Sequence, residues 1–80
     1  MPYLLIKNRD KTIYAGDVDT ISSYNKVGLF SVLLDHSNFI SLIEKQVIIR
    51  TKDGREQQIA LDNGLLKVRG NTINIYVGVK

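Results

Sequence analysis

Asp35 and His36 are the pair of adjacent side chains in this sequence that could exchange a proton at neutral pH. His36 is the one histidine among the 80 residues, and the chain has no cysteine that could act as a nucleophile or bind a soft metal. Neighbouring side chains on a strand point to opposite faces, so these two would rarely act together. Catalysis would also need a nucleophile and an oxyanion site. We therefore predict that the protein is not an enzyme and that His36 is a structural residue or a contact residue on a loop.

Two further carboxylates, on Asp17 and Asp19, could share one face of a strand. A calcium site needs roughly six to eight oxygen ligands from a tight loop, and the neighbouring residues do not supply them. These carboxylates are more typical of an edge strand, where charge discourages pairing with another sheet. The segments DGRE and NGLL, which begin at Asp53 and Asn63, lack the spacing of a phosphate-binding loop. The sequence therefore predicts no metal and no cofactor.

The charge balance raises nucleic-acid binding as an alternative function. The formal net charge is +3, but 11 basic residues are scattered among 8 acidic ones, whereas a nucleic-acid footprint gathers Lys and Arg on one face. An OB-like domain would also need aromatic side chains that form one stacking platform. The tyrosines lie on separate segments, at Tyr3, Tyr14, Tyr24 and Tyr76. Whether they converge depends on the strand order, so a small OB-like nucleic-acid-binding β-domain remains the alternative.

The elements that must position these side chains are β-strands. Apolar and polar residues alternate with period two through much of the chain, as in strands with one buried face. Asp53-Gly54 predicts a hairpin because both residues tolerate positive φ, and Asn63-Gly64 and Gly70-Asn71 predict two more turns. A single hairpin is marginal in water, so the hairpins must stack against the first half of the chain. We expect an all-β fold, an antiparallel β-sandwich of roughly nine or ten short strands in two sheets.

The densest apolar clustering lies at residues 27–43, where a polar corner at residues 35–38 separates two apolar runs. Two short buried strands joined by an exposed loop fit this pattern. A helix at residues 39–44 is the rival, because the apolar residues there also fall at helical spacing. Earlier in the chain, Val18 and Ile21 are spaced so that strict alternation cannot place both on one face. A β-bulge between them is therefore expected.

The 80 residues make one domain, residues 1–80, with room for one small core. No apolar run approaches the roughly 20 residues that span a bilayer. Met1-Pro2-Tyr3 leads directly into a strand-like run, which is not typical of a signal peptide. We expect a domain that does not insert into the membrane directly and is a monomer in isolation.

The segment GLFSVLLDHSNF, which begins at Gly28, resembles a block of the epsilon subunit of bacterial F-type ATP synthases. That block commonly reads Gly-Glu-x-Gly-x-Leu-Pro-x-His-x-Pro-Leu, and Gly28, Leu33 and His36 match it in register. Three positions depart from it, with Leu29 in place of Glu and with Leu34 and Asn38 in place of Pro. The flanking segments IYAGDVDTI, DGREQQIALDNGLLKV and NTINIYV agree as well. The resemblance therefore covers nearly the whole chain.

This resemblance implies the fold and function of the family's N-terminal domain, a flattened β-sandwich. In the family this domain binds the gamma subunit and stands on the polar loops of the membrane c-ring, so that the rotor turns as one body. The implied function is that of a non-catalytic central-stalk subunit, which couples gamma to the c-ring during proton- or sodium-driven ATP synthesis at the cytoplasmic face of the cell membrane. The resemblance covers this domain alone and not the C-terminal helical hairpin into which the family normally continues.

By the same resemblance, the c-ring interface comprises Asn8 in the first turn together with Gly28, Leu29, Ser31, Asp35 and His36. The family's Glu meets basic ring loops through its charge, whereas Leu29 offers only apolar area. Either the ring loops of this organism are less basic, or the charged contact has moved to Asp35. No short motif marks the surface that faces gamma, so the sequence leaves it unassigned.

Overall fold

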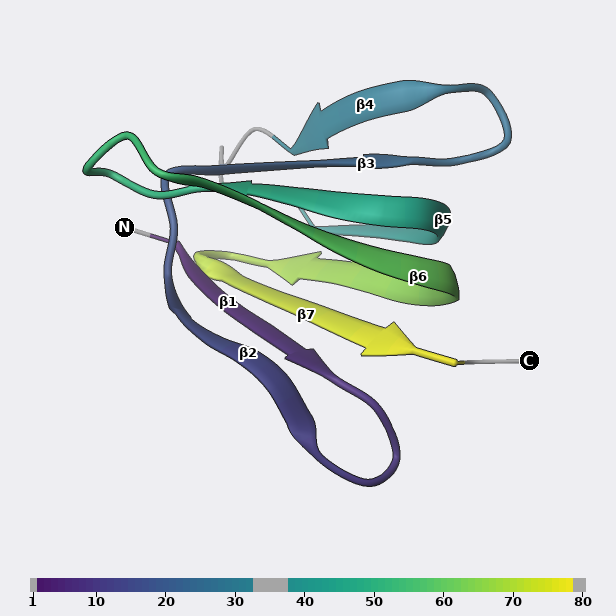
Figure 1. Ribbon diagram of the computed structural model, residues 1–80. Coiled ribbons are helices and arrows are strands. Elements are labelled where there is room, and N and C mark those ends of the chain that lie inside the picture. Colours follow the sequence, from purple (N-terminus) through teal and green to yellow (C-terminus); the bar gives the residue numbers. More distant parts are fainter. Residues whose placement is uncertain (1, 33–37, 79–80) are drawn as a thin grey trace.

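The computed structural model describes residues 2–32 and 38–78. Its strands are β1 (Tyr3–Lys7), β2 (Thr12–Asp17), β3 (Thr20–Tyr24), β4 (Leu29–Val32), β5 (Phe39–Arg50), β6 (Glu56–Arg69) and β7 (Thr72–Val77). They form one hydrogen-bonded sheet of seven strands in the order β2-β1-β7-β6-β5-β3-β4 (Figure 1). The expected all-β fold is confirmed, since the described residues include no helix. The rival helix at residues 39–44 is wrong, because β5 occupies these residues.

The sheet folds over on itself because its two longest strands, β5 and β6, each run through both layers (Figure 1). β3 pairs with β5 only beyond Ile43, and β7 pairs with β6 only from Gly64 onward. The β3–β4 layer therefore consists of β4, β3 and residues 45–50 and 56–61 of the long strands. The β1–β7 layer consists of β2, β1, β7 and residues 39–43 and 64–69. Seven strands thus build the sandwich for which we expected roughly nine or ten shorter ones.

The fold-over replaces the turn predicted at Asn63-Gly64, and this turn prediction is wrong. β6 continues through both residues, but its register with β5 shifts at this point. Glu44 of β5 pairs with Asn63, whereas the next residue, Lys45, pairs with Leu61. Asp62 is therefore an extra residue on β6, and such a β-bulge bends a strand and increases its twist.

The bulge also changes which face of β6 meets the core. Before the bulge, Ile59 and Leu61 pack against the core, whereas Leu66 and Val68 are buried after it. Because side chains on a strand alternate with period two, this change from odd to even positions requires one inserted residue. Both layers contribute to one buried cluster, which consists of Leu4, Ile6, Val18, Ile21, Val32, Ile43, Val47, Ile49, Leu66, Val68, Ile73 and Ile75.

The other two turn predictions are confirmed. Gly54 and Gly70 adopt positive φ angles of 87° and 61° in the turns that precede β6 and β7. The exposed loop predicted at residues 35–38 lies outside the described residues except for Asn38, which is exposed. Two strands flank it, β4 before it and β5 after it, but they are not the two short buried strands that we expected, because β5 has 12 residues and both strands include exposed ones.

The connection between β2 and β3 differs from the bulge expected between Val18 and Ile21. The ladder is broken here, and the chain passes from the β1–β7 layer to the β3–β4 layer (Figure 1). The backbone N–H of Val18 donates to the Pro2 carbonyl oxygen at 2.9 Å, and that of Asp19 donates to the Arg50 carbonyl oxygen at 2.8 Å. The sheet is also not wholly antiparallel, because β1 and β7 run parallel. This pairing places the first and last strands side by side in one layer, with the N- and C-termini at opposite ends of the sandwich (Figure 1).

Candidate interaction surfaces

Asn8 builds the β1–β2 turn and does not project from it. Its Oδ1 accepts hydrogen bonds from the backbone N–H groups of Asp10 and Lys11, both at 2.8 Å. Its own N–H donates to the Lys11 carbonyl oxygen at 3.0 Å. An Asn-closed turn of this kind fixes the loop locally. The side chains available to a partner are therefore those of Arg9, Asp10 and Lys11, which are exposed.

The β3–β4 turn, residues 25–28, is closed in a similar way. Oδ1 of Asn25 accepts from the N–H groups of Val27 at 2.8 Å and Gly28 at 3.1 Å. Gly28 has a φ of 143°, which L side chains rarely adopt, so glycine permits this turn. The turn holds Val27 at its tip, where 96% of the residue is exposed, and Leu29 follows with 61% exposed.

The two Asn-closed turns lie at the same end of the sandwich, where β5 and β6 also fold over (Figure 1). This end, composed of residues 8–11 and 25–29 and of the bulge at Asp62, is termed the turn end. It presents charged side chains from the first turn, and Lys26 together with the apolar Val27 and Leu29 from the second. Both kinds are held on loops whose backbones are fixed by hydrogen bonds.

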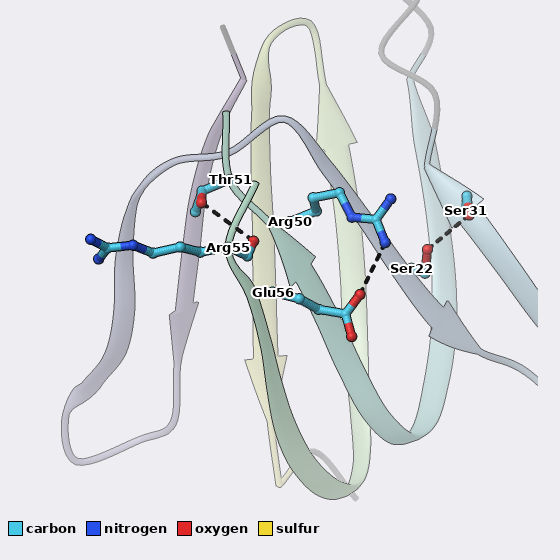
Figure 2. Close-up of polar contacts among 6 residues, drawn as sticks. All are labelled: Ser22, Ser31, Arg50, Thr51, Arg55 and Glu56. Carbon is cyan, nitrogen blue, oxygen red and sulfur yellow. Dashed lines mark hydrogen bonds and ion pairs between the residues drawn. The ribbon is translucent and has the colours of Figure 1, made fainter. Parts of the chain in front are cut away.

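The structure brings three of the residues predicted for the c-ring interface to the turn end, namely Asn8, Gly28 and Leu29. Ser31 lies further along β4, where its hydroxyl and that of Ser22 form a hydrogen bond of 2.8 Å (Figure 2). Asp35 and His36, the remaining two, lie outside the described residues.

The outer face of the β3–β4 layer carries polar side chains around the partly exposed Ile48. Beyond the Ser22–Ser31 pair, Arg50 and Glu56 form an ion pair of 3.0 Å across the hairpin that joins β5 and β6 (Figure 2). Both side chains are exposed, so this pair contributes at most about 1 kcal/mol. In the hairpin loop, the Thr51 hydroxyl donates to the Asp53 carboxylate and lies 3.3 Å from the Arg55 carbonyl oxygen (Figure 2).

The outer face of the β1–β7 layer carries exposed apolar side chains among polar ones. Ile40 and Leu42 on β5 are 63% and 68% exposed. Leu42 pairs with Leu65 on β6, which pairs in turn with Tyr76 on β7. We term the apolar side chains on this side of the layer the apolar outer face. They are Tyr3, Leu5, Ile40, Leu42, Leu65 and Tyr76.

Sequence reasoning missed this face, although the sequence carries a signal for it. The start of β5 is apolar at Ile40 and Leu42 as well as at Phe39 and Ile43. A strand that is apolar on both of its faces is typical of one that is covered on both sides. The structure covers only the inner side, where Ile43 is buried.

The four tyrosines do not form one stacking platform. Tyr24 lies on the β3–β4 layer with the Lys45 Nζ 5.2 Å from its ring centroid, and Tyr76 lies on the β1–β7 layer with the Lys7 Nζ at 5.3 Å. Tyr14 packs against the core, and Tyr3 belongs to the apolar outer face. The four tyrosines therefore do not provide the single aromatic face that an OB-like nucleic-acid-binding domain requires.

Asp17 ends β2, which is an edge strand of the sheet, as expected for a charged edge. Among residues 2–32 and 38–78, no group of three or more His, Cys, Asp or Glu residues is placed to hold a metal ion. Within the same residues, no helix has the length and apolarity needed to cross a bilayer.

Comparison with known proteins gives consistent matches. Residues 4–79 match the family described as ATP synthase, Delta/Epsilon chain, beta-sandwich domain. The ATP synthase epsilon chain of Geotalea uraniireducens (strain Rf4) is 30% identical over 67 residues, which make up 84% of this chain and 49% of that protein. This chain thus spans about half the length of the curated relatives that it matches.

Two solved structures show the same fold. One is a chain of the Euglena gracilis mitochondrial ATP synthase, OSCP/F1/c-ring in rotational state 1, with a TM-score of 0.86 at 18% identity over 95% of this chain and 49% of that one. The other is a chain of the Tetrahymena thermophila mitochondrial ATP synthase central stalk/c-ring, with a TM-score of 0.76 at 13% identity over 94% of this chain and 61% of that one.

Proposed function

Since this chain belongs to the ATP synthase delta/epsilon chain β-sandwich domain family, we propose that it is a rotor subunit of an F-type ATP synthase. In this role its single domain binds the gamma subunit and the membrane c-ring, and couples their rotation during proton- or sodium-driven ATP synthesis. Beyond family membership, the proposal is supported by the geometry of the turn end. There, Val27 and Leu29 are exposed on a turn that hydrogen bonds hold in place.

The turn end is proposed to stand on the polar loops of the c-ring. Asn8 contributes by fixing the β1–β2 turn, because its Oδ1 is already engaged by two backbone N–H groups. Gly28 contributes by permitting the backbone of the second turn, and Leu29 contributes apolar contact area. Ser31, Asp35 and His36 complete the proposed interface by resemblance to the family.

This role requires no bond to be made or broken. Torque passes through two interfaces, so the subunit must be a rigid body rather than a catalyst. A sandwich with one continuous core and two Asn-closed turns meets that requirement, since local deformation would break backbone hydrogen bonds or expose the core. The proposed location is the cytoplasmic face of the cell membrane, where the subunit is held by its partners.

Affinity purification of the tagged chain from the membranes of its own organism tests this proposal. We expect the gamma subunit and the c-ring to copurify, whereas an unrelated β-sandwich of similar charge with the same tag should recover neither. Recovery of the tagged chain without either rotor subunit would contradict the proposal.

The nucleic-acid alternative is tested separately. Because the tyrosines lie on different surfaces, we expect negligible affinity for single-stranded DNA or RNA at physiological salt. Fluorescence anisotropy with labelled oligonucleotides measures this affinity. Binding tighter than about micromolar at that salt, which exceeds ordinary non-specific affinity, would favour the alternative.

A further inference from the structure

A cavity of about 780 Å³ is lined by the β1–β2 turn and by the end of β7. We term it the basic pocket, because its lining includes the cations Lys7, Arg9 and Lys11, together with Asp10, Thr12 and Tyr76. β7 contributes Tyr76 to this lining because it pairs with β1, where Tyr76 lies beside Lys7. Sites for small molecules commonly enclose roughly 300–1,000 Å³, so the basic pocket has room for a ligand.

The cations of the basic pocket form no ion pair within residues 2–32 and 38–78. The ion pairs in this part of the chain join Arg50 to Glu56 and Arg55 to Asp53, and neither involves the β1–β2 turn. Three cations and the single carboxylate of Asp10 leave the pocket with a net charge of +2. A concavity with an excess of positive charge attracts anions.

Two sets of contacts hold the cations of the basic pocket in place. The Lys7 Nζ lies 5.3 Å from the centroid of the Tyr76 ring, and this cation–π contact restrains the ammonium group. The hydrogen bonds accepted by the Asn8 Oδ1 fix the backbone from which Arg9 and Lys11 project. Donors that are held in position before binding lose less conformational entropy when a ligand arrives.

Phosphate groups suit these side chains better than a single carboxylate does. The Arg9 guanidinium offers paired N–H donors that match phosphate oxygens, and lysine ammonium groups are compact charges that also bind phosphate. The Thr12 hydroxyl can donate a further hydrogen bond. A carboxylate brings one negative charge, whereas a phosphate monoester brings about −1.5 to −2 at neutral pH. A phosphate group therefore matches the net charge of the pocket more closely.

We propose that the basic pocket binds an anion that carries phosphate groups, either a free phosphorylated compound or the headgroup of an anionic lipid. The inference goes beyond the proposed rotor function and does not depend on it, because this chain alone supplies every residue of the pocket. A nucleic-acid strand is a poor ligand here, since cations gathered at one pocket neutralise only a few phosphates of a long strand.

Binding of inorganic diphosphate, measured by calorimetry, and of phosphatidylglycerol vesicles, measured by cosedimentation, tests the proposal at low salt. Lys7→Gln and Arg9→Gln should each weaken the observed binding about tenfold, because each removes a charge-assisted hydrogen bond. The matched control is Lys45→Gln on the β3–β4 layer. It removes the same charge and a similar contact, since the Lys45 Nζ lies 5.2 Å from the Tyr24 ring centroid. This variant should bind like the wild type.

Binding of diphosphate would identify a free phosphorylated ligand, and binding of the vesicles alone would identify a lipid headgroup. Either result supports the proposal when Lys7→Gln and Arg9→Gln weaken binding and Lys45→Gln does not. Absence of binding to both, or equal weakening by all three variants, overturns it, because the charge would then act without a defined site. Melting temperatures should stay near that of the wild type, since Arg9 and Lys45 are exposed and Lys7 is partly exposed. If Lys7→Gln alone melted lower, Arg9→Gln would decide the test.

Discussion

The backbone of Gly64 lies so close to that of Tyr76 that an added Cβ atom would sit 2.9 Å from the Tyr76 carbonyl oxygen. We therefore expect Gly64→Ala to lower the free energy of unfolding by about 1–3 kcal/mol, because one backbone must move away from the other. Gly16→Ala is the control, since its Cβ would meet only the Tyr14 side chain at 3.9 Å. Urea unfolding measures both variants. Equal stability of the two would show that this close approach imposes no constraint.

Gly64 also shows why one part of the fold could not be predicted from the sequence. Asn63-Gly64 between apolar runs is a good turn signal, just as Asp53-Gly54 is, and only the second is a turn. The difference lies in tertiary contacts. β7 approaches Gly64 closely enough to demand glycine in a continuous strand, and β7 follows later in the chain. Local turn chemistry carries no information about that contact.

The candidate site was predicted in part. The block that begins at Gly28 was assigned to the interface by its resemblance to the family, and the structure shows that its first residue completes a turn closed by Asn25. Asn8 was identified as a contact residue, whereas its Oδ1 in fact closes the turn, which only the hydrogen-bond partners reveal. The parallel pairing of β1 with β7 was not predicted, and without it Tyr3 and Leu5 of β1 could not be placed on the same face as Tyr76 of β7.

Among the residues that the structure describes, Ser23 is the polar one that is buried, and its hydroxyl donates to the Gln46 carbonyl oxygen at 2.7 Å. We expect Ser23→Ala to destabilise the protein by about 0.5–1.5 kcal/mol, because it removes a hydrogen bond at a partly buried position. Its neighbour Ser22 bonds only to the exposed Ser31, so Ser22→Ala should change stability by less than about 0.5 kcal/mol. Thermal unfolding of the two variants makes the comparison. A Ser22→Ala effect as large as that of Ser23→Ala would contradict it.

The Thr51 hydroxyl, which donates to the Asp53 carboxylate, is the main reason that the pKa of Asp53 lies below its ordinary value of 3.8; Arg55 lowers it further through its backbone N–H and its charge. A carboxyl whose folded pKa is depressed stabilises the fold above its unfolded pKa and loses this contribution as the pH falls through the folded pKa. We expect Thr51→Ala to raise the pKa of Asp53 towards 3.8. Titration of Asp53 by NMR measures this, with Thr12→Ala as a control that should leave the titration unchanged.

Leu29, at the turn end, is 61% exposed and stands where the family usually has Glu. Leu29→Asp should cost on the order of 1–2 kcal/mol of c-ring binding, because apolar contact area is lost. Leu29→Glu restores the family residue, so it should bind as well as the wild type or better if the ring loops are basic, and more weakly if they are not. Binding to the purified ring distinguishes these cases. Both variants should melt close to the wild type, because little of the Leu29 side chain is in the core. If both melted far below it, Leu29 would support the fold and the loss of binding would say nothing about the ring.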